Sequence, residues 1–415
     1  MTSDLIRGAN EVSPISDAVS EFYNAHPYPP PVENLDRARD QWKDSNRHLA
    51  EFHLFWPNKS YRPDFDVLIA GCGTWQAARF AAIHPEANVV GIDVSTTSLE
   101  HTEQLKRKYD LTNLQIVQLP IEHALELNRQ FDLIVCTGVL HHLADPGAGL
   151  SALRPTMKAD AVLYLMVYAA YGRAGIYLIQ EYCRKLGIGT TGQEIEELME
   201  VVKSLSPQHP LSTILRAARD AGDNNALADA LLNPRDRAYS VSQLLDLIES
   251  HALKLGRWYR QAPYLTSCGS ITTTPHAKLL AGLSDREQYA AMELFRGTMT
   301  THSIVAYRSD SQSQTLPQFD DERFQTWIPI RCPRTLCVLD RLPKGTAGVL
   351  LNQSHSFSDL ILFIDAAEKR LFDAIDSSRT VAEILEQSRF EDLPMARGFF
   401  EKLYHYDQVV FDASN

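Results

Sequence analysis

The sequence has few cysteines, and they are not grouped. Among its 415 residues no two cysteines form a Cys-x-x-Cys pair. Zinc sites and disulfide frameworks depend on such spacings, so the sequence predicts neither, and we expect no metal. The six cysteines are scattered along the chain as Cys72, Cys136, Cys183, Cys268, Cys332 and Cys337. Free thiols suit a reducing compartment, and we therefore expect a cytoplasmic protein.

The sequence also lacks an excess of positive charge and a long apolar run. It has 40 Lys and Arg against 52 Asp and Glu, a net charge of −12, without a block of basic residues. This balance disfavours nucleic acid and anionic membranes as partners. The longest apolar run, 161–170, is too short to span a bilayer, and the first residues lack the apolar core of a signal peptide.

One stretch organises the chain, and it reads as a strand, a glycine turn and the start of a helix. Val67 to Ala70 are apolar, as in a parallel strand that is covered on both faces. Gly71-Cys72-Gly73 follows at once, and strong helix formers occupy 74–82. A ligand across this turn would meet bare backbone and a helix N-terminus, as in nucleotide-binding α/β sheets.

Spacing strengthens this interpretation. The expected second strand, 88–94, carries Asp93, 20 residues after Gly73. An acid at that place accepts hydrogen bonds from a ribose diol. The sixth position of a dinucleotide fingerprint counted from Gly71 is Gln76 and not glycine. This disfavours NAD and favours an adenosine ligand without a pyrophosphate.

Three motifs occur in order along the next strands: Asp66 to Gly73, Gly91 to Ser95, and Phe131 to Pro146. Together they resemble class I S-adenosylmethionine-dependent methyltransferases over about residues 61–170. The resemblance implies a Rossmann-like seven-stranded sheet of order 3-2-1-4-5-7-6, with the last strand antiparallel, and S-adenosyl-L-methionine as cofactor. Strands six and seven are expected near 253–259 and 303–308.

The resemblance also implies the cofactor site. Gly71 and Gly73 would contact the methionine part, with Cys72 and Gln76 beside them, and Asp93 with Val94 would hold the ribose. The adenine would lie against Ile121 and Glu122, while Thr137, Gly138 and His141 would line the sulfonium side. Two positions depart from the family pattern, because Trp75 replaces the usual third glycine and Pro120 replaces an acid that often follows strand three.

The flanking segments are expected to build the acceptor side. Residues 1–60 would form an N-terminal cap, in which the stiff run 26–31 acts as a lid. Residues 61–310 would form the methyltransferase domain, with helical insertions at about 170–237 and 262–302 that line the substrate pocket. Residues 320–415, with three expected helices and a terminal strand, look like a small α+β, winged-helix-like domain.

The candidate catalytic residues are histidines and a tyrosine. A base is needed when the acceptor has a proton to lose, and His26, His141 and His142 are the candidates, with His141, His26 and Tyr168 preferred. Adjacent His141 and His142 cannot both point at one atom. Tyr28, Tyr171 and Arg173 are expected to contact the acceptor, Arg173 through a carboxylate.

The leading hypothesis is methyl transfer to a small molecule in an aromatic-walled pocket. A peptide or protein methyltransferase that uses residues 320–415 for recognition is the alternative, and a non-catalytic cofactor sensor is another. An NAD oxidoreductase ranks last because of Gln76. A homodimer is compatible with the sequence, which does not name the acceptor atom.

Overall fold

The computed structural model describes residues 14–217, 222–311 and 316–414. By their contacts the residues divide into two compact units. The first comprises the chain up to Asp40, Pro63–Leu253 and Gly297–His302, and the second comprises Gln41–Arg62, Lys254–Arg296 and the chain from Ser303 onward. The boundaries of these units differ from those of the domains expected from the sequence.

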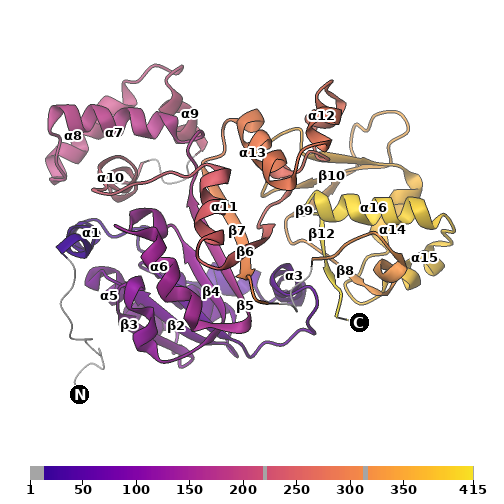
Figure 1. Ribbon diagram of the computed structural model, residues 1–415, viewed down its shortest axis with the longest axis horizontal. Coiled ribbons are helices and arrows are strands. Elements are labelled where there is room, and N and C mark those ends of the chain that lie inside the picture. The colour runs from indigo at the N-terminus through magenta and orange to yellow at the C-terminus, as the bar shows by residue number, and fades with distance from the viewer. Residues whose placement is uncertain (1–13, 218–221, 312–315, 415) are drawn as a thin grey trace. The chain divides into compact units, whose positions relative to one another are not determined.

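A seven-stranded sheet of order β3-β2-β1-β4-β5-β7-β6 runs through the chain, and most of its strands are labelled in Figure 1. The order expected from the sequence is therefore confirmed. The neighbouring strands from β3 to β5 pair in parallel. The strands are β1 Asp66–Ala70, β2 Asn88–Asp93, β3 Leu114–Gln118, β4 Phe131–Thr137, β5 Met157–Tyr168, β6 Leu253–Trp258 and β7 Thr301–Arg308.

The central strand is buried on both faces, which explains its uninterrupted apolar sequence. Val67, Leu68, Ile69 and Ala70 are fully shielded from solvent. Parallel register with Val89 to Ile92 on one side and Leu133 to Val135 on the other places three strand ends beside one another. Because parallel strands end at the same edge, the loops that follow them meet there. The helices that follow β1 to β4 are α4 Gln76–Ile83, α5 Thr96–Lys108, the 3₁₀ helix η1 Ile121–Leu127, the short turn η2 Leu140–His142 and α6 Pro146–Leu153.

The insertion after β5 is helical, as expected, and has a small core of its own. Its apolar side chains include Ile176, Leu198, Leu211 and Leu227, which pack in one cluster. The helices are α7 Ala174–Leu186, α8 Gly192–Lys203, α9 Pro210–Ala217 and α10 Asn224–Leu232, before α11 Val241–Glu249 leads toward β6. The N-terminal helix α1, Pro14–Ala25, packs on this insertion, because Phe22 lies in a cluster with Ile195 and Ala228.

In the second unit, helix α3, Ser45–Phe55, packs against the C-terminal strands. Its Ala50 lies with Ile330 and Val410 in one apolar cluster. The three helices expected after residue 320 are present, and so is the terminal strand, but two small sheets accompany them. Their elements are β8 Ile328–Arg331 with β12 Val409–Asp412, β9 Thr335–Val338 with β10 Gly348–Asn352 and β11 Ile361–Ile364, and helices α14 Ala366–Asp373, α15 Val381–Ser388 and α16 Leu393–His405. Helices α2 Asp36–Gln41, α12 Ala277–Ala281 and α13 Asp285–Arg296 complete the chain's longer elements.

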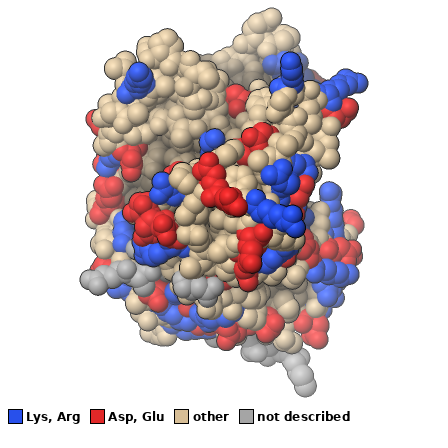
Figure 2. Space-filling model, turned by 90° about the vertical axis from the view of Figure 1, so that its right-hand side faces the viewer, with Lys and Arg blue, Asp and Glu red and all other residues tan. Residues whose placement is uncertain are grey.

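The surface shown in Figure 2 carries acidic and basic side chains interspersed, without a continuous basic patch among the described residues on that face. In the described part of the chain, no helix combines the length and apolarity that a bilayer crossing requires. Within the same residues, no group of three or more His, Cys, Asp or Glu side chains is arranged to hold a metal ion.

A buried ion pair in the second unit generates a stability prediction. Asp407 accepts hydrogen bonds from Arg257 at 2.9 Å and from the Ala262 N–H at 3.1 Å. The side chains of Arg257 and Asp407 are only 3% and 7% exposed. Removing one member of such a pair leaves an uncompensated buried charge. We expect Asp407→Ala to lower the free energy of unfolding by about 3–5 kcal/mol in chemical denaturation.

The matched control is Asp340→Ala, which removes one member of an ion pair whose side chains are 93% and 87% exposed. Exposed pairs contribute about 1 kcal/mol or less. Equal effects of the two substitutions would show that Arg257 and Asp407 do not stabilise this unit as a buried pair.

Candidate functional site

The glycine turn after β1 folds over the end of β2. The backbone N–H groups of Gly71 and Cys72 both donate to the carbonyl oxygen of Ile92 at 2.9 Å. Gly71 and Gly73 have φ angles of 76° and 54°, a left-handed conformation that favours glycine. A Cβ at Gly71 would also collide with the side chain of Val139. Both the backbone conformation and the close packing therefore require glycine here.

The Asp93 carboxylate fixes the far side of this turn. Its Oδ2 accepts from the Gly73 N–H at 2.8 Å, and its Oδ1 accepts from the Ser95 N–H at 2.9 Å. Each carboxylate oxygen has a second lone pair, so the group retains acceptor capacity for a ribose diol. Burial raises the pKa of Asp93, while these backbone hydrogen bonds oppose that rise.

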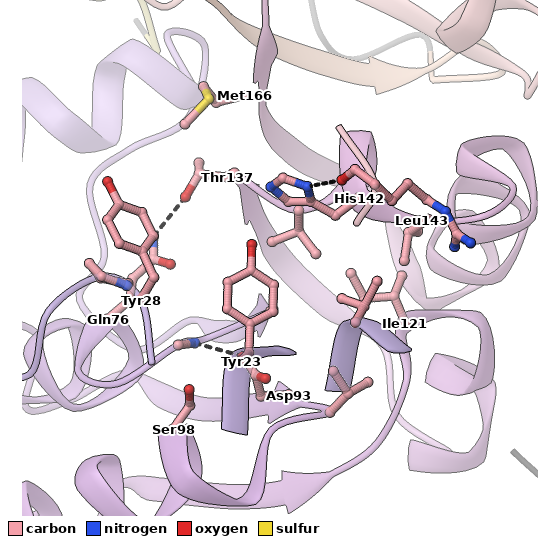
Figure 3. A pocket seen from close by; sticks show the side chains of 18 of the residues that line it. Tyr23, Tyr28, Gln76, Asp93, Ser98, Ile121, Thr137, His142, Leu143 and Met166 are labelled. Carbon is pink, nitrogen blue, oxygen red and sulfur yellow. Dashed lines mark hydrogen bonds between the residues drawn. The ribbon is translucent and has the colours of Figure 1, made fainter. Parts of the chain in front are cut away.

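A cavity of about 540 Å³ opens at the carboxyl ends of β1, β2, β4 and β5. Figure 3 shows Asp93 and Ser98 at one side of it, Ile121 and Leu143 at another, and Thr137 and Met166 farther along. Its volume lies in the range of sites for small molecules and cofactors. All the residues that line it belong to the first unit.

The lining fits an adenosine-containing ligand with an amino acid part. Leu119, Ile121 and Leu143 provide an apolar wall for a base. Trp75, at the place of the expected third glycine, lines the cavity too, and its buried Nε1–H has no partner among the described residues. The turn glycines and Asp93 complete the arrangement.

Nine of the ten residues expected at the cofactor line this cavity: Gly71, Gly73, Gln76, Asp93, Val94, Ile121, Glu122, Thr137 and Gly138. The tenth, Cys72, is fully buried and does not line it. Its side chain lies toward Gly91, where an added Cβ would approach the sulfur. A contact of Cys72 with the ligand is thus limited to its backbone.

The chain before β1 lies over the cavity, as the lid hypothesis requires. Tyr28 and Pro29 line the cavity, and the Pro29 carbonyl oxygen accepts from Thr74 Oγ1 at 2.6 Å. Ser20 Oγ donates to the Val94 carbonyl oxygen at 3.2 Å. His26 does not line the cavity. Its side chain is turned instead to Thr190, whose carbonyl oxygen lies 3.1 Å from Nε2. The structure therefore gives no support to His26 as a catalytic residue.

Sequence reasoning missed a buried polar network at the acceptor end. Tyr23 donates its hydroxyl hydrogen to Asp229 Oδ1 at 2.7 Å, and Tyr168 donates to Asp229 Oδ2 at 3.3 Å. Asn233 donates to the Tyr23 hydroxyl at 3.0 Å. Burial, and next the Asp229 charge, raise the pKa of both tyrosines well above the ordinary value. Tyr168 thus lines the cavity as a protonated phenol and not as a base.

The two adjacent histidines take different places, and His142 lines the cavity whereas the preferred candidate, His141, does not. His141 is fully buried behind the cavity against the Tyr168 ring, with ring centroids 3.8 Å apart. Burial lowers the pKa of His141 well below the ordinary value, and the electrostatic interactions with neighbouring His142 and Arg173 add to this effect. His141 therefore supports the wall as a neutral ring.

The expected acceptor contacts are only partly brought together. Arg173 lines the cavity, but it pairs with Asp236 at 3.2 Å and stacks over the Tyr168 ring, 3.4 Å from the centroid. Its charge is thus compensated within the protein. Tyr171 is 48% exposed and does not line the cavity. Of the three residues expected to contact the acceptor, Tyr28 and Arg173 remain candidates.

Comparisons with known proteins agree with this geometry. The family model of a methyltransferase domain matches residues 68–163. An uncharacterized protein of Synechococcus sp. is 26% identical over 395 residues, which covers 91% of this chain and 90% of that protein. The ubiquinone biosynthesis O-methyltransferase of Actinobacillus pleuropneumoniae is 26% identical over 148 residues, and this match covers 32% of the chain and 62% of that enzyme.

Among solved structures, PKMT2 from Rickettsia typhi has a similar fold. It superimposes with a TM-score of 0.60 at 16% identity, over 91% of this chain and 74% of that chain. A second structure of PKMT2, in complex with AdoHcy, gives a TM-score of 0.58. At this identity the likeness establishes the fold. Together with the matched domain, this likeness agrees with the class I methyltransferase fold that the sequence resembles.

The prediction for this site concerns the contribution of Asp93 to ligand binding. We expect Asp93→Ala to weaken the binding of S-adenosylhomocysteine by about 2–4 kcal/mol in calorimetry, because a charged acceptor is lost. Since burial raises the Asp93 pKa, the carboxylate gains its proton earlier as the pH falls. Affinity should therefore decrease from neutral toward acid pH.

The control is Asp93→Asn, which keeps the shape and removes the titration. Its affinity should be low and independent of pH over the same interval. A wild-type affinity that does not change with pH, together with an unaltered affinity of Asp93→Ala, would exclude Asp93 from the ligand site.

Proposed function

Because residues 68–163 match the family model of a methyltransferase domain, we propose that the protein transfers a methyl group from S-adenosylmethionine to a small-molecule acceptor. The observation that carries this proposal is the cavity of about 540 Å³, whose lining includes Tyr23, Tyr28 and Tyr168 beside the cofactor residues. A cavity with aromatic walls and a chain segment across it suits a compact acceptor.

The cofactor contacts follow from the geometry described above. The bare backbone of Gly71 and Gly73 would lie against the methionine part, Asp93 would accept from the ribose hydroxyls, and Ile121 would pack on the adenine. When bound, S-adenosylmethionine supplies a methyl group on a positively charged sulfur, which an acceptor atom displaces in line. The protein's contribution is to hold the acceptor in that line and to exclude water.

The segment from α1 to Pro29 is proposed to be the lid. It is attached to both sides of the cavity, because Asn24 Oδ1 accepts from Ser95 Oγ at 2.9 Å, and Tyr23 bonds to Asp229 in the helical insertion. The sheet loops and the insertion are thus joined across the acceptor end. A filled cavity would strengthen this closure, since the lid then gains contacts with the ligand.

Asn24→Ala tests the lid. Asn24 Oδ1 also accepts from Thr96 Oγ1 at 3.2 Å and from the Thr97 N–H at 3.3 Å. At about 1 kcal/mol for each net hydrogen bond, losing these three bonds should weaken S-adenosylhomocysteine binding by about 100-fold. Limited proteolysis should cut the segment faster in the variant, and the ligand should protect the wild type.

The control for this test is Asn46→Ala, at an exposed position of the second unit. A lid that is cleaved equally fast with and without ligand would reduce the segment to a linker. Deleting residues 1–31 is a less specific experiment, because it would also remove Phe22 from its cluster with Ile195 and Ala228.

The acceptor class is tested with a labelled methyl group. Incubation of the protein with methyl-labelled S-adenosylmethionine and a cell extract should place the label in the soluble, low-mass fraction. Label in precipitated protein would instead assign a peptide or protein acceptor. Ligand binding without any labelled product would indicate a sensor. Deleting residues 316–415 would not decide this question, because α3 packs against β8 and β12 within the second unit.

A further inference from the structure

His142 is held in one tautomer by the backbone. It ends the short turn η2 directly after β4, and its Nδ1 lies 2.6 Å from the carbonyl oxygen of Arg235. A carbonyl oxygen can only accept, so Nδ1 donates and carries the proton of the neutral ring. The lone pair of the neutral imidazole is therefore on Nε2.

The other ring nitrogen, Nε2, is buried, in a residue that lines the cavity, without a partner in the described part of the chain. His142 lines the cavity and is only 3% exposed, and its Nε2 has no hydrogen-bond partner among the described residues. Figure 3 shows Nδ1 turned to the carbonyl oxygen and the opposite edge of the ring toward the side where Thr137 lies. Buried polar nitrogens are rarely left unpaired in proteins, and a ligand in the cavity would provide the partner.

The other titratable groups around His142 are unsuited to accept a proton. Tyr23 from α1 and Tyr168 from β5 approach its ring at centroid distances of 6.0 and 5.7 Å. Both phenols keep their protons, because burial and the Asp229 charge raise their pKa. His141 lies 4.2 Å from His142 but does not line the cavity. Arg173 and Arg235 also line the cavity, and they are donors.

We propose that His142 is the general base of the methyl transfer and that the acceptor is a phenol or enol hydroxyl. This inference rests on the proposed function. Imidazole is the commonest general base near neutral pH, and an acidic hydroxyl is the acceptor that such a base can activate. The aromatic walls formed by Tyr23, Tyr28 and Tyr168 fit a planar, conjugated molecule.

The proton and electron balance is complete without another reactant. The acceptor oxygen gives an electron pair to the methyl carbon, the pair of the broken carbon–sulfur bond stays on sulfur, and the hydroxyl proton passes to His142 Nε2. The protonated ring then has its Nδ1–H on the Arg235 carbonyl and its new Nε2–H at the cavity, from which the proton returns to solvent.

His142→Asn separates the base from the rest of the site. The asparagine amide can still donate to the Arg235 carbonyl, but it has no basic nitrogen. With methyl-labelled cofactor and a cell extract, we expect product formation to fall by about 10²- to 10⁴-fold, the usual contribution of a general base. S-adenosylhomocysteine affinity should stay within about twofold, because no cofactor contact is assigned to His142.

A second reaction needs no base. In this reaction the sulfur of bound S-adenosylhomocysteine would attack the carbon of methyl iodide and iodide would leave with the bonding pair, so that S-adenosylmethionine forms and no proton has to be removed. His142→Asn should leave this reaction unchanged. An equal loss in both reactions would show that His142 only shapes the cavity. The matched control is His276→Asn, at an exposed position in the second unit, which should change neither reaction.

A readout independent of activity is the ¹⁵N spectrum of histidine-labelled protein, in which the His142→Asn variant assigns the signals. We expect the tautomer with a protonated Nδ1 and an unprotonated Nε2, because Nδ1 donates to the Arg235 carbonyl oxygen. A proton on Nε2 at neutral pH, or full extract activity in His142→Asn, would overturn the assignment. A wild type that neither labels an extract nor makes S-adenosylmethionine from methyl iodide would overturn the proposed function instead.

Discussion

The hydrogen bonds of the Asp93 carboxylate are the constraint on which the site depends. One oxygen accepts from the Gly73 N–H and the other from the Ser95 N–H. The glycine turn after β1 and the helix start after β2 are thereby fixed to the same group. Because that group is charged and only partly exposed, a small movement of either loop would leave a partly shielded charge without these partners, which is costly. This cost keeps the cofactor end of the cavity preorganised.

The acceptor end is built in a different way. Its side chains come from α1, β5 and the helical insertion, and they meet at Asp229, which accepts from both Tyr23 and Tyr168. None of these segments forms the acceptor end alone. The β5 strand supplies a fixed position, whereas α1 and α10 are attached through hydrogen bonds and a small apolar cluster around Phe22. Such attachment fits a part of the site that must admit and release an acceptor.

The polar and charged groups at the acceptor end differ in whether they have partners within the protein. Arg173 is compensated by Asp236, and Tyr23 and Tyr168 are protonated donors to Asp229. His142 differs from these groups, because the Arg235 carbonyl satisfies one ring nitrogen and leaves the other at the cavity. The orientation of the His142 ring depends on a remote loop, because Arg235, whose carbonyl oxygen binds Nδ1, lies 93 positions later in the sequence. The proposed chemistry therefore depends on the insertion as well as on the sheet.

The sequence determined the sheet and the cofactor end, because these depend on local patterns. An apolar run, a Gly-x-Gly turn and an acid at the end of the next strand indicate a nucleotide-binding α/β sheet within about 30 residues, and the strand order was implied by the family that the motifs resemble. Only the tertiary structure decided the acceptor end. Neighbours such as His141 and His142 are equivalent in sequence, but Tyr168 packs on one and the Arg235 carbonyl binds the other. No pattern in the sequence predicted the hydrogen bond between Tyr23 and Asp229 either, because a bond across 206 positions arises only when the insertion folds back over the sheet.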